Sequence, residues 1–443
     1  MSAKRPNFLF ILADDLGFSD IGCYGAEIQT PNIDRLAAEG VRMLNHHAAA
    51  ACSPTRAMLM SGTGAHLGGL GVLIEYKMSE KGAKRYSGKA GYEGFLNEDV
   101  AMLPEILEDY GYYTAMSGKG YALHKDHGRA AFKRHLTMMP GCCNNYDYGW
   151  EPTQERFPVG GRLLHAEEGK KVDITPNKSE DPNGFYSTTD YYTNRLIQYF
   201  AGRSEDEQSK PFFAFLPYTA PHWPLQCSKA QRDKYKGVYD DSPYALRERR
   251  LKKLVDMGII DQSVIPHEVE TTTQGVGEWD QFTPEEKKFS SAAMEAYAGM
   301  VDSIDVNVGR IVDYLKRTGE YDNTFIVFIS DNGAEGAAME AIREDISLRD
   351  LLSPDSHDFR WAKLEGLRRA PWIAANAAHD EALLEDKSGG VDTAVTRDGY
   401  DSRAPSPSRE QSSFICFEYE VAGRESQYDY RHRHGTIEYS TRS

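Results

Sequence analysis

A cysteine beside the predicted start of a helix is the residue of this chain best placed for chemistry. Cys52 precedes Ser53 and Pro54, which suit the N-cap and the first position of a helix, and helix formers follow from Ala57. The helix dipole favours an anion at this end, and Arg56 lies one turn further on. Cys52 is therefore a candidate nucleophile for a charged oxyanion ester. A buried small residue and a thiolate nucleophile fit the same pattern.

Oxygen-bearing side chains follow two strongly apolar runs, residues 7–13 and 324–330, which have the pattern of buried parallel strands. These side chains are Asp14, Asp15, Asp331 and Asn332. Open α/β sheets bind ligands at the carboxyl ends of strands, and adjacent carboxylates repel unless a cation lies between them. The set suits a hard cation such as Ca²⁺ or Mg²⁺ and not zinc. By itself, the Asp14–Asp15 pair also fits a solvated turn with a helix-capping Asp.

Two more polar residues follow predicted strands. Residues 112–117 lead to Lys119, and residues 211–218 lead to His222, which has prolines on both sides. These prolines restrict the backbone, so His222 is a rigidly held candidate for a general acid. Lys119 is a candidate anion contact. An ordinary surface lysine and a hydrogen-bonded structural histidine are the alternative interpretations.

Helical patterns separate these strands. Helices are predicted from Thr30 onward and over residues 103–110, 188–200 and 294–316, the last with apolar side chains at helical spacing from Met300 to Leu315. If the crossovers have the usual hand, the acidic strand ends meet at one edge of one sheet.

The bulk composition limits the partners and the compartment. The chain has 443 residues and a net charge of −16, which argues against a nucleic-acid partner. Its six cysteines form no spaced framework, which favours a reducing compartment. The N-terminal apolar run is short for a signal peptide, and no run has the length of a membrane span. We therefore expect a soluble cytoplasmic protein with no membrane partner.

The ordered motifs of the chain resemble the sulfatase family of the alkaline-phosphatase superfamily. They are Ala-Asp-Asp-Leu-Gly from Ala13, Cys-Ser-Pro-Thr-Arg from Cys52, Gly-Lys at 118–119, Ala-Pro-His-Trp-Pro from Ala220 and Ser-Asp-Asn-Gly-Ala-Glu from Ser330. The resemblance runs from about residue 5 to residue 361 and is strongest to soluble bacterial and fungal arylsulfatases. It implies an α/β fold with a large mixed, mostly parallel sheet flanked by helices.

The resemblance also implies a site. It places one Ca²⁺ per chain on Asp14, Asp15, Asp331, Asn332 and the oxidised residue 52. A formylglycine-generating maturation enzyme would oxidise Cys52 to formylglycine, the precursor of the nucleophile. The hydrated aldehyde would attack a small-molecule sulfate ester and then release sulfate in a second step. Arg56 and Lys119 would hold the diol and sulfate oxygens, and His222 would help the alcohol leave.

The chain departs from the family pattern in two places. Tyr121 stands where the family has a His after the Gly-Lys pair, and His124 and His127 are possible substitutes in a different register. The family's later substrate-contacting Lys has only a weak candidate, Lys363. We predict a catalytic domain over residues 1–375 with a helical insertion at about 229–290. Residues 376–443 are predicted to be a disordered tail in place of an absent or degenerate C-terminal subdomain.

The function predicted from the sequence is hydrolysis of sulfate esters by an arylsulfatase-like enzyme. Two alternatives stay open at this point. The same site can act on phosphate or phosphonate esters, as related members of the superfamily do. The chain can also be a truncated, inactive homologue that at most binds anions or a partner.

Overall fold

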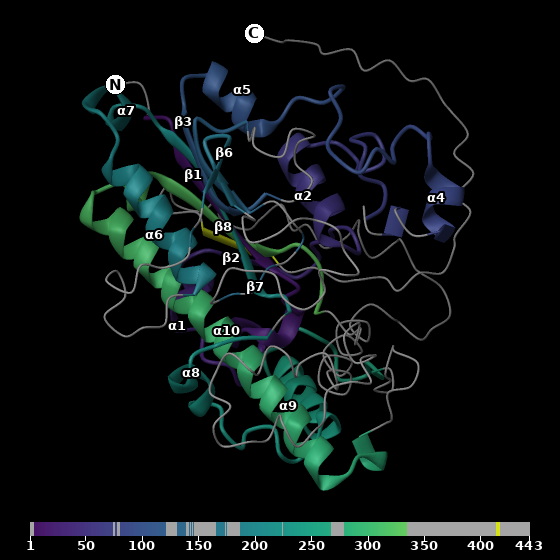
Figure 1. The fold of residues 1–443 in the computed structure, drawn as a ribbon. Coiled ribbons are helices and arrows are strands. Elements are labelled where there is room, and N and C mark those ends of the chain that lie inside the picture. The colour runs from purple at the N-terminus through teal and green to yellow at the C-terminus, as the bar shows by residue number, and fades with distance from the viewer. Residues whose placement is uncertain are drawn as a thin grey trace.

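The computed structural model describes residues 4–73, 76–77, 80–120, 131–138, 141, 143, 145, 165–172, 174, 187–223, 225–266, 279–334 and 413–416. A central sheet organises these residues (Figure 1). Its strands are β1 (Asn7–Asp14), β2 (Val41–Met43), β3 (Tyr113–Lys119), β4 (Arg134–Met138), β5 (His165–Glu167), β6 (Lys170–Val172), β7 (Phe212–Pro221), β8 (Thr324–Ser330) and β9 (Ser413–Cys416). The predicted strands at residues 7–13, 112–117, 211–218 and 324–330 are confirmed.

The strand order is β2-β9-β8-β1-β7-β3-β4-β5-β6. Every pairing is parallel except β4–β5 and β5–β6, which are antiparallel. The described residues therefore form a mixed, mostly parallel sheet, as predicted. Because β1 lies between β7 and β8, the N-terminal strand is at the centre of the sheet.

Helices cover both faces of this sheet (Figure 1). The α-helices of the described residues are α1 (Pro31–Glu39), α2 (Cys52–Ser61), α4 (Glu80–Tyr86), α5 (Leu103–Asp109), α6 (Thr188–Ala201), α7 (Glu205–Gln208), α8 (Lys229–Asp233), α9 (Pro243–Asp256) and α10 (Pro284–Arg317). Of these, α1, α6 and α10 cover one face of the sheet, and α2 and α5 cover the other. Side chains alternate along β1, so that Leu9 and Ile11 pack with α1, α6 and α10. Leu12 packs on the other face with α2 and α5.

Helix α10 is the long helix that the apolar spacing predicted, and its stripe is core. The buried members of the stripe are Met300, Val301, Ile304, Val308, Ile311, Val312 and Leu315. The helix begins ten residues before the predicted start, at Pro284 instead of residue 294. Its first turns were missed because buried serines interrupt the apolar pattern there. The Ser291 hydroxyl donates to the Lys287 carbonyl one turn earlier, which lets a serine sit inside a helix.

Helix α5 confirms the predicted helix at residues 103–110 but not its buried side. Ile106, Leu107 and Tyr110 are the apolar positions that the sequence predicts for it. Leu107 packs against the core together with Leu103, whereas Ile106 and Tyr110 are 42% and 70% exposed. In a short helix, a rotation by one residue decides which side is buried, and the sequence pattern alone did not fix that rotation.

The polar sequence of residues 152–184, rich in Gly and Pro, predicts a long surface excursion, but part of this segment belongs to the sheet. The hairpin of β5 and β6 extends the sheet there. His165 of β5 is 1% exposed, and its Nε2 atom lies 2.9 Å from the Tyr192 hydroxyl of α6. Burial lowers the pKa of His165 to about 3, so the imidazole is neutral in the folded chain.

We expect acid to weaken the fold through His165. An unfolded histidine takes up a proton near pH 6.5, whereas the buried imidazole does not, so stability present above pH 6.5 is lost as the pH falls toward 3. Between pH 7 and pH 5 this amounts to about 2 kcal/mol. Urea unfolding at both pH values checks the prediction. The His165→Gln variant should lack this part of the acid sensitivity, and an equal loss in both proteins would contradict it.

The predicted insertion at about residues 229–290 contains helices α8 and α9. The predicted tail, residues 376–443, lies outside the described residues except for β9, which pairs in parallel with β2 and β8. A strand in this tail was not predicted, because four residues are too few to give a periodic signal. Within the described part of the chain, no helix is both long and apolar enough to cross a membrane.

Candidate active site

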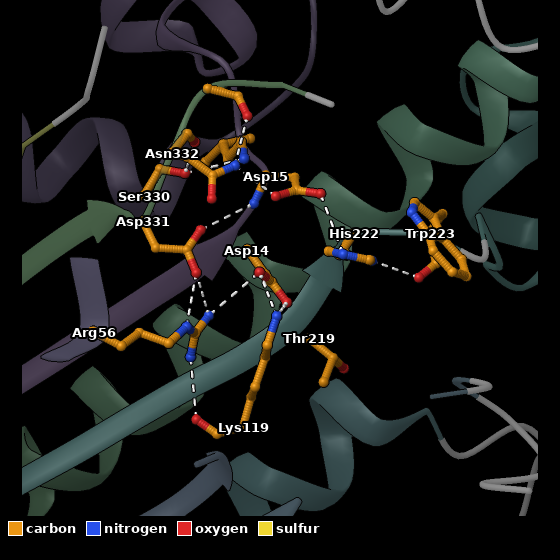
Figure 2. A network of polar contacts seen from close by, with 12 residues as sticks. Asp14, Asp15, Arg56, Lys119, Thr219, His222, Trp223, Ser330, Asp331 and Asn332 are labelled. Carbon is orange, nitrogen blue, oxygen red and sulfur yellow. Dashed lines mark hydrogen bonds and ion pairs between the residues drawn. The ribbon is translucent and has the colours of Figure 1, made fainter. Parts of the chain in front are cut away.

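Four neighbouring strands bring the candidate residues together at their carboxyl ends. The order β8-β1-β7-β3 places the ends of β8 and β1 side by side, with Ala13 in register with Ser330. Asp331 and Asn332 follow β8, Asp14 ends β1, His222 follows β7 and Lys119 ends β3. The structure thus gathers at one sheet edge the residues that the sequence assigned to four separate strand ends (Figure 2).

Helix α2 brings Cys52 and Arg56 to the same edge, but it begins earlier than predicted. The helix starts at Cys52, and Ala51 is its N-cap, with an extended backbone and no side-chain cap. Ser53 was expected to cap the helix and is instead fully buried within its first turn. The Thr55 hydroxyl oxygen accepts a hydrogen bond from the N–H of Ala49, which precedes the helix, with an N–O distance of 2.8 Å. Cys52 therefore lies in the first turn, where the amides have no partner within the helix.

Two buried cations neutralise two carboxylates at the centre of the site. The Lys119 Nζ atom lies 2.8 Å and 2.6 Å from the two oxygens of Asp14. The Arg56 Nε atom donates to Asp331 at 2.7 Å, and its Nη1 atom donates to the Lys119 carbonyl at 3.1 Å. The four side chains are 0% exposed. Separating either pair would leave a buried charge without a partner, which costs much free energy. We therefore expect the four side chains to be held rigidly.

Asp15 follows in a left-handed backbone conformation, with φ at 62°. Its N–H donates to Asp331 at 3.2 Å, and its Oδ1 accepts from the Asn332 amide at 2.6 Å. Its Oδ2 lies 3.5 Å from the His222 Nε2 atom, and the His222 Nδ1 atom lies 2.7 Å from the Trp223 carbonyl (Figure 2). The turn at Asp15 thereby joins the end of β8 to the residue that follows β7.

The surroundings of Cys52 favour a protonated thiol. The side chain is partly buried, and one ligand atom each of Cys52, Asp14 and Asp331 lie within 4.8 Å of one another. Loss of water raises the pKa of the Cys52 thiol to about 12; Lys119 opposes this rise and the two carboxylates add to it. The alternative of an unmodified thiolate nucleophile is therefore disfavoured at neutral pH.

The donor set fits a hard cation. Asp14, Asp15 and Asp331 supply three carboxylates against the two cations Arg56 and Lys119, which leaves one negative charge in excess. The Asp15 Oδ2 and Asn332 Oδ1 atoms are buried without a hydrogen-bond partner among the described residues. Burial raises the pKa of Asp331, and Arg56 opposes that rise. An oxygen-coordinated cation such as Ca²⁺ would satisfy these oxygens and the missing positive charge.

Sequence reasoning did not find two residues that support this site. Ser330 accepts the Leu16 N–H at 3.0 Å with its hydroxyl oxygen, and Asp20 accepts the Gly17 N–H at 3.0 Å. Ser330 belongs to the identified Ser-Asp-Asn-Gly-Ala-Glu motif, whereas Asp20 lies three residues beyond the Ala-Asp-Asp-Leu-Gly motif, so closeness to a motif was the available signal. The remaining candidates lie outside the described residues. They are Tyr121, His124, His127 and Lys363.

Comparison with known proteins gives a consistent result. The family model described as Sulfatase matches residues 6–372. An uncharacterized sulfatase of Schizosaccharomyces pombe is 48% identical over 345 residues, which are 77% of this chain and 60% of that protein. An arylsulfatase of Klebsiella aerogenes is 31% identical over 346 residues, which are 75% of this chain and 67% of that protein. The chain thus spans 60% of the length of its yeast relative.

A solved structure supports the architecture. The crystal structure of Ps i-CgsB superposes with a TM-score of 0.51 at 23% identity, and the match covers 75% of this chain and 59% of that chain. At this identity the likeness concerns the fold alone. It agrees with the mostly parallel sheet and its flanking helices.

Proposed function

The chain belongs to the sulfatase family, and from this premise we propose that it hydrolyses sulfate esters of small alcohols or phenols. One observation carries the proposal. Residue 52 lies at a helix start together with the Asp14 and Asp331 carboxylates and with two buried cations, Arg56 and Lys119. That arrangement suits a nucleophile that attacks a group whose negative charge is delocalised over several oxygens.

Cys52 is proposed to be the precursor of the nucleophile. Its thiol is held protonated by its surroundings, so direct attack as a thiolate is unfavourable. Oxidation to formylglycine by a maturation enzyme would supply a hydrated aldehyde, whose hydroxyl can attack sulfur and whose covalent adduct divides one difficult step into two. The N–H groups of residues 52 and 53 in the first turn of α2 would help to hold the developing negative charge beside this residue.

Arg56 and Lys119 are proposed to bind the oxygens of the sulfate group and of residue 52. Both are fully buried and fixed by carboxylates, so they need not reorganise during the reaction. A Ca²⁺ ion held by Asp14, Asp15, Asp331, Asn332 and the oxidised residue 52 would supply further positive charge to the transferring group. We likewise propose that the metal is calcium, that each chain binds one ion and that residue 52 becomes formylglycine.

His222 is proposed to donate a proton to the leaving alcohol. Its Nδ1 atom contacts the Trp223 carbonyl, an acceptor that favours a proton on Nδ1, while Nε2 faces Asp15 at 3.5 Å. The ring therefore has a fixed orientation at the edge of the site. It is half-buried, so that it can reach a bound substrate.

The leaving-group role of His222 gives a prediction. The His222→Asn variant should hydrolyse esters of poorly acidic phenols about 10²–10⁴-fold more slowly, because these leaving groups need the proton. The effect should be much smaller for 4-nitrophenyl sulfate, whose phenolate leaves without help. Rates over a series of aryl sulfates check this. A uniform loss over the whole series would indicate that His222 only binds the substrate.

Co-expression of the chain with a formylglycine-generating enzyme tests the proposed function. Mass spectrometry of the peptide that carries Cys52 should show the aldehyde, and the purified chain should hydrolyse an aryl sulfate in a calcium-dependent manner. An unmodified thiol together with no turnover would refute the proposal. Faster hydrolysis of an aryl phosphonate ester than of an aryl sulfate would favour the phosphoryl alternative.

Two other predictions from the sequence stay predictions. The division into a catalytic domain at residues 1–375 and a tail at 376–443 depends largely on residues outside the described ranges. The cytoplasmic location depends on the cysteine pattern of the sequence.

A further inference from the structure

A buried chain of polar contacts leads from the turn at Asp15 to helix α9, and the proposed function assigns it no role. Its members are Asp20, Glu27, Tyr239, Arg250 and Tyr297. Asp20 and Tyr239 are 0% exposed, Arg250 is 1% exposed and Tyr297 is 3% exposed. Such a set is costly to bury unless every charge is paired, so its position beside the site calls for a physical reason.

The turn after β1 is held by three consecutive amides, each of which donates to a side chain. The pairs are Asp15 N–H to Asp331 Oδ1 at 3.2 Å, Leu16 N–H to Ser330 Oγ at 3.0 Å and Gly17 N–H to Asp20 Oδ2 at 3.0 Å. Two of the acceptors come from the end of β8, and the third is Asp20. The left-handed conformation of Asp15 costs of order 1–3 kcal/mol, so contacts of this kind must stabilise it.

Asp20 is in turn fixed from two sides. The Tyr297 hydroxyl of α10 donates to Asp20 Oδ2 at 2.6 Å and lies 3.4 Å from the Asp15 carbonyl oxygen. The Arg250 guanidinium of α9 pairs with Asp20 and makes two hydrogen bonds to Glu27, at 2.9 Å and 2.8 Å. One hydroxyl thus contacts both the proposed ligand residue Asp15 and the side chain that anchors its turn.

We infer that Asp20, held by Tyr297 and Arg250, is a positioning residue for the proposed metal site. Helix α9, predicted as part of an insertion, then supports the site through Arg250. The inference rests on the proposed function, because Asp15 must be a metal ligand for its position to matter. Loss of a residue that orients metal ligands typically weakens metal binding by about 10–100-fold.

Two tyrosines of this network allow a matched test. Tyr297 and Tyr239 are both buried, and each donates its hydroxyl to a carboxylate, at 2.6 Å and 2.8 Å. Only Tyr297 reaches the Asp15 turn. Calorimetric titration of the full chain with calcium chloride should show about tenfold weaker binding for Tyr297→Phe. The control Tyr239→Phe should bind calcium within about twofold of the parent chain.

A second measurement needs no metal. Amide hydrogen exchange of the peptide covering residues 15–24 should be faster in Tyr297→Phe than in Tyr239→Phe. Only the first substitution removes a hydroxyl that contacts the Asp15 turn. If Tyr297→Phe does not fold, Asp20→Asn replaces it, since the amide keeps the shape of the side chain and removes its charge.

The outcomes separate the two ideas. Calcium binding by the parent chain with equal behaviour of the two tyrosine variants in both measurements would overturn the positioning role and leave the proposed function standing. Absence of calcium binding in the parent chain would refute the metal site in the proposed function. In that case, faster amide hydrogen exchange in Tyr297→Phe alone would still indicate that Asp20 stabilises the turn.

Discussion

Replacing Cys52 with alanine should reduce aryl sulfate hydrolysis by at least about 10³-fold, because no precursor of the nucleophile is then present. The thiol is partly buried at the first turn of α2 and contributes little to packing. The free energy of unfolding should therefore change by less than about 1 kcal/mol. Steady-state rates and urea unfolding of the same preparation measure the two effects.

A matched control comes from a second cysteine. Cys227 is buried beside Gly299 of α10 and is not in the Asp14–Cys52–Asp331 cluster, so Cys227→Ala should leave activity nearly unchanged even where it lowers stability. If Cys52→Ala retained activity comparable to that of Cys227→Ala, residue 52 would not be the nucleophile precursor.

Replacing Arg56 with methionine should destabilise the metal-free chain by about 3–5 kcal/mol, because a buried ion pair loses one partner. The guanidinium lies 2.6 Å from Asp331 and 3.4 Å from Asp14, and all three side chains are 0% exposed. Lys119 alone would then face both carboxylates. Urea unfolding in the presence of a chelator measures the loss. Saturating calcium should restore part of it, since a cation can compensate the buried negative charge that loses its partner.

Arg249→Met provides the comparison, because Arg249 pairs with Asp241 on the surface of α9. These side chains are 43% and 48% exposed, so solvent screens the pair. Its loss should cost only about 0–1 kcal/mol. Equal effects of the two methionine substitutions would contradict the view that burial makes the Arg56 pair essential.

The sequence predicted the central strands well because their signal is local. Residues 7–13 and 324–330 are continuous apolar runs ended by acids, and each became a buried strand with polar residues at its carboxyl end. A parallel sheet then brings such ends to one edge, which is why Asp14 and Asp331 meet. The α/β class and the grouping of the candidate residues followed from this reasoning and from the family resemblance.

What the sequence did not predict depends on contacts between distant residues. Asp20 and Arg250 are 230 positions apart, and no spacing rule relates a carboxylate after β1 to a guanidinium in α9. The left-handed turn at Asp15 is likewise held in part by Asp331 and Ser330 at the end of β8, which no local sequence pattern relates to Asp15. The start of α2 was misplaced because serine is a typical N-cap residue, whereas Ser53 is buried inside the first turn and Ala51 is the N-cap.

The central place of β1 has a consequence for the synthesis of the protein. Its neighbour β8 begins 317 residues later, with Asn7 in register with Thr324. At about 5–20 residues per second, a ribosome needs roughly 15 to 60 s to make that intervening chain. During this interval one edge of the apolar first strand has no partner. Newly made chains are therefore most prone to aggregation before β8 emerges, and slower translation after β7 would lengthen that exposure.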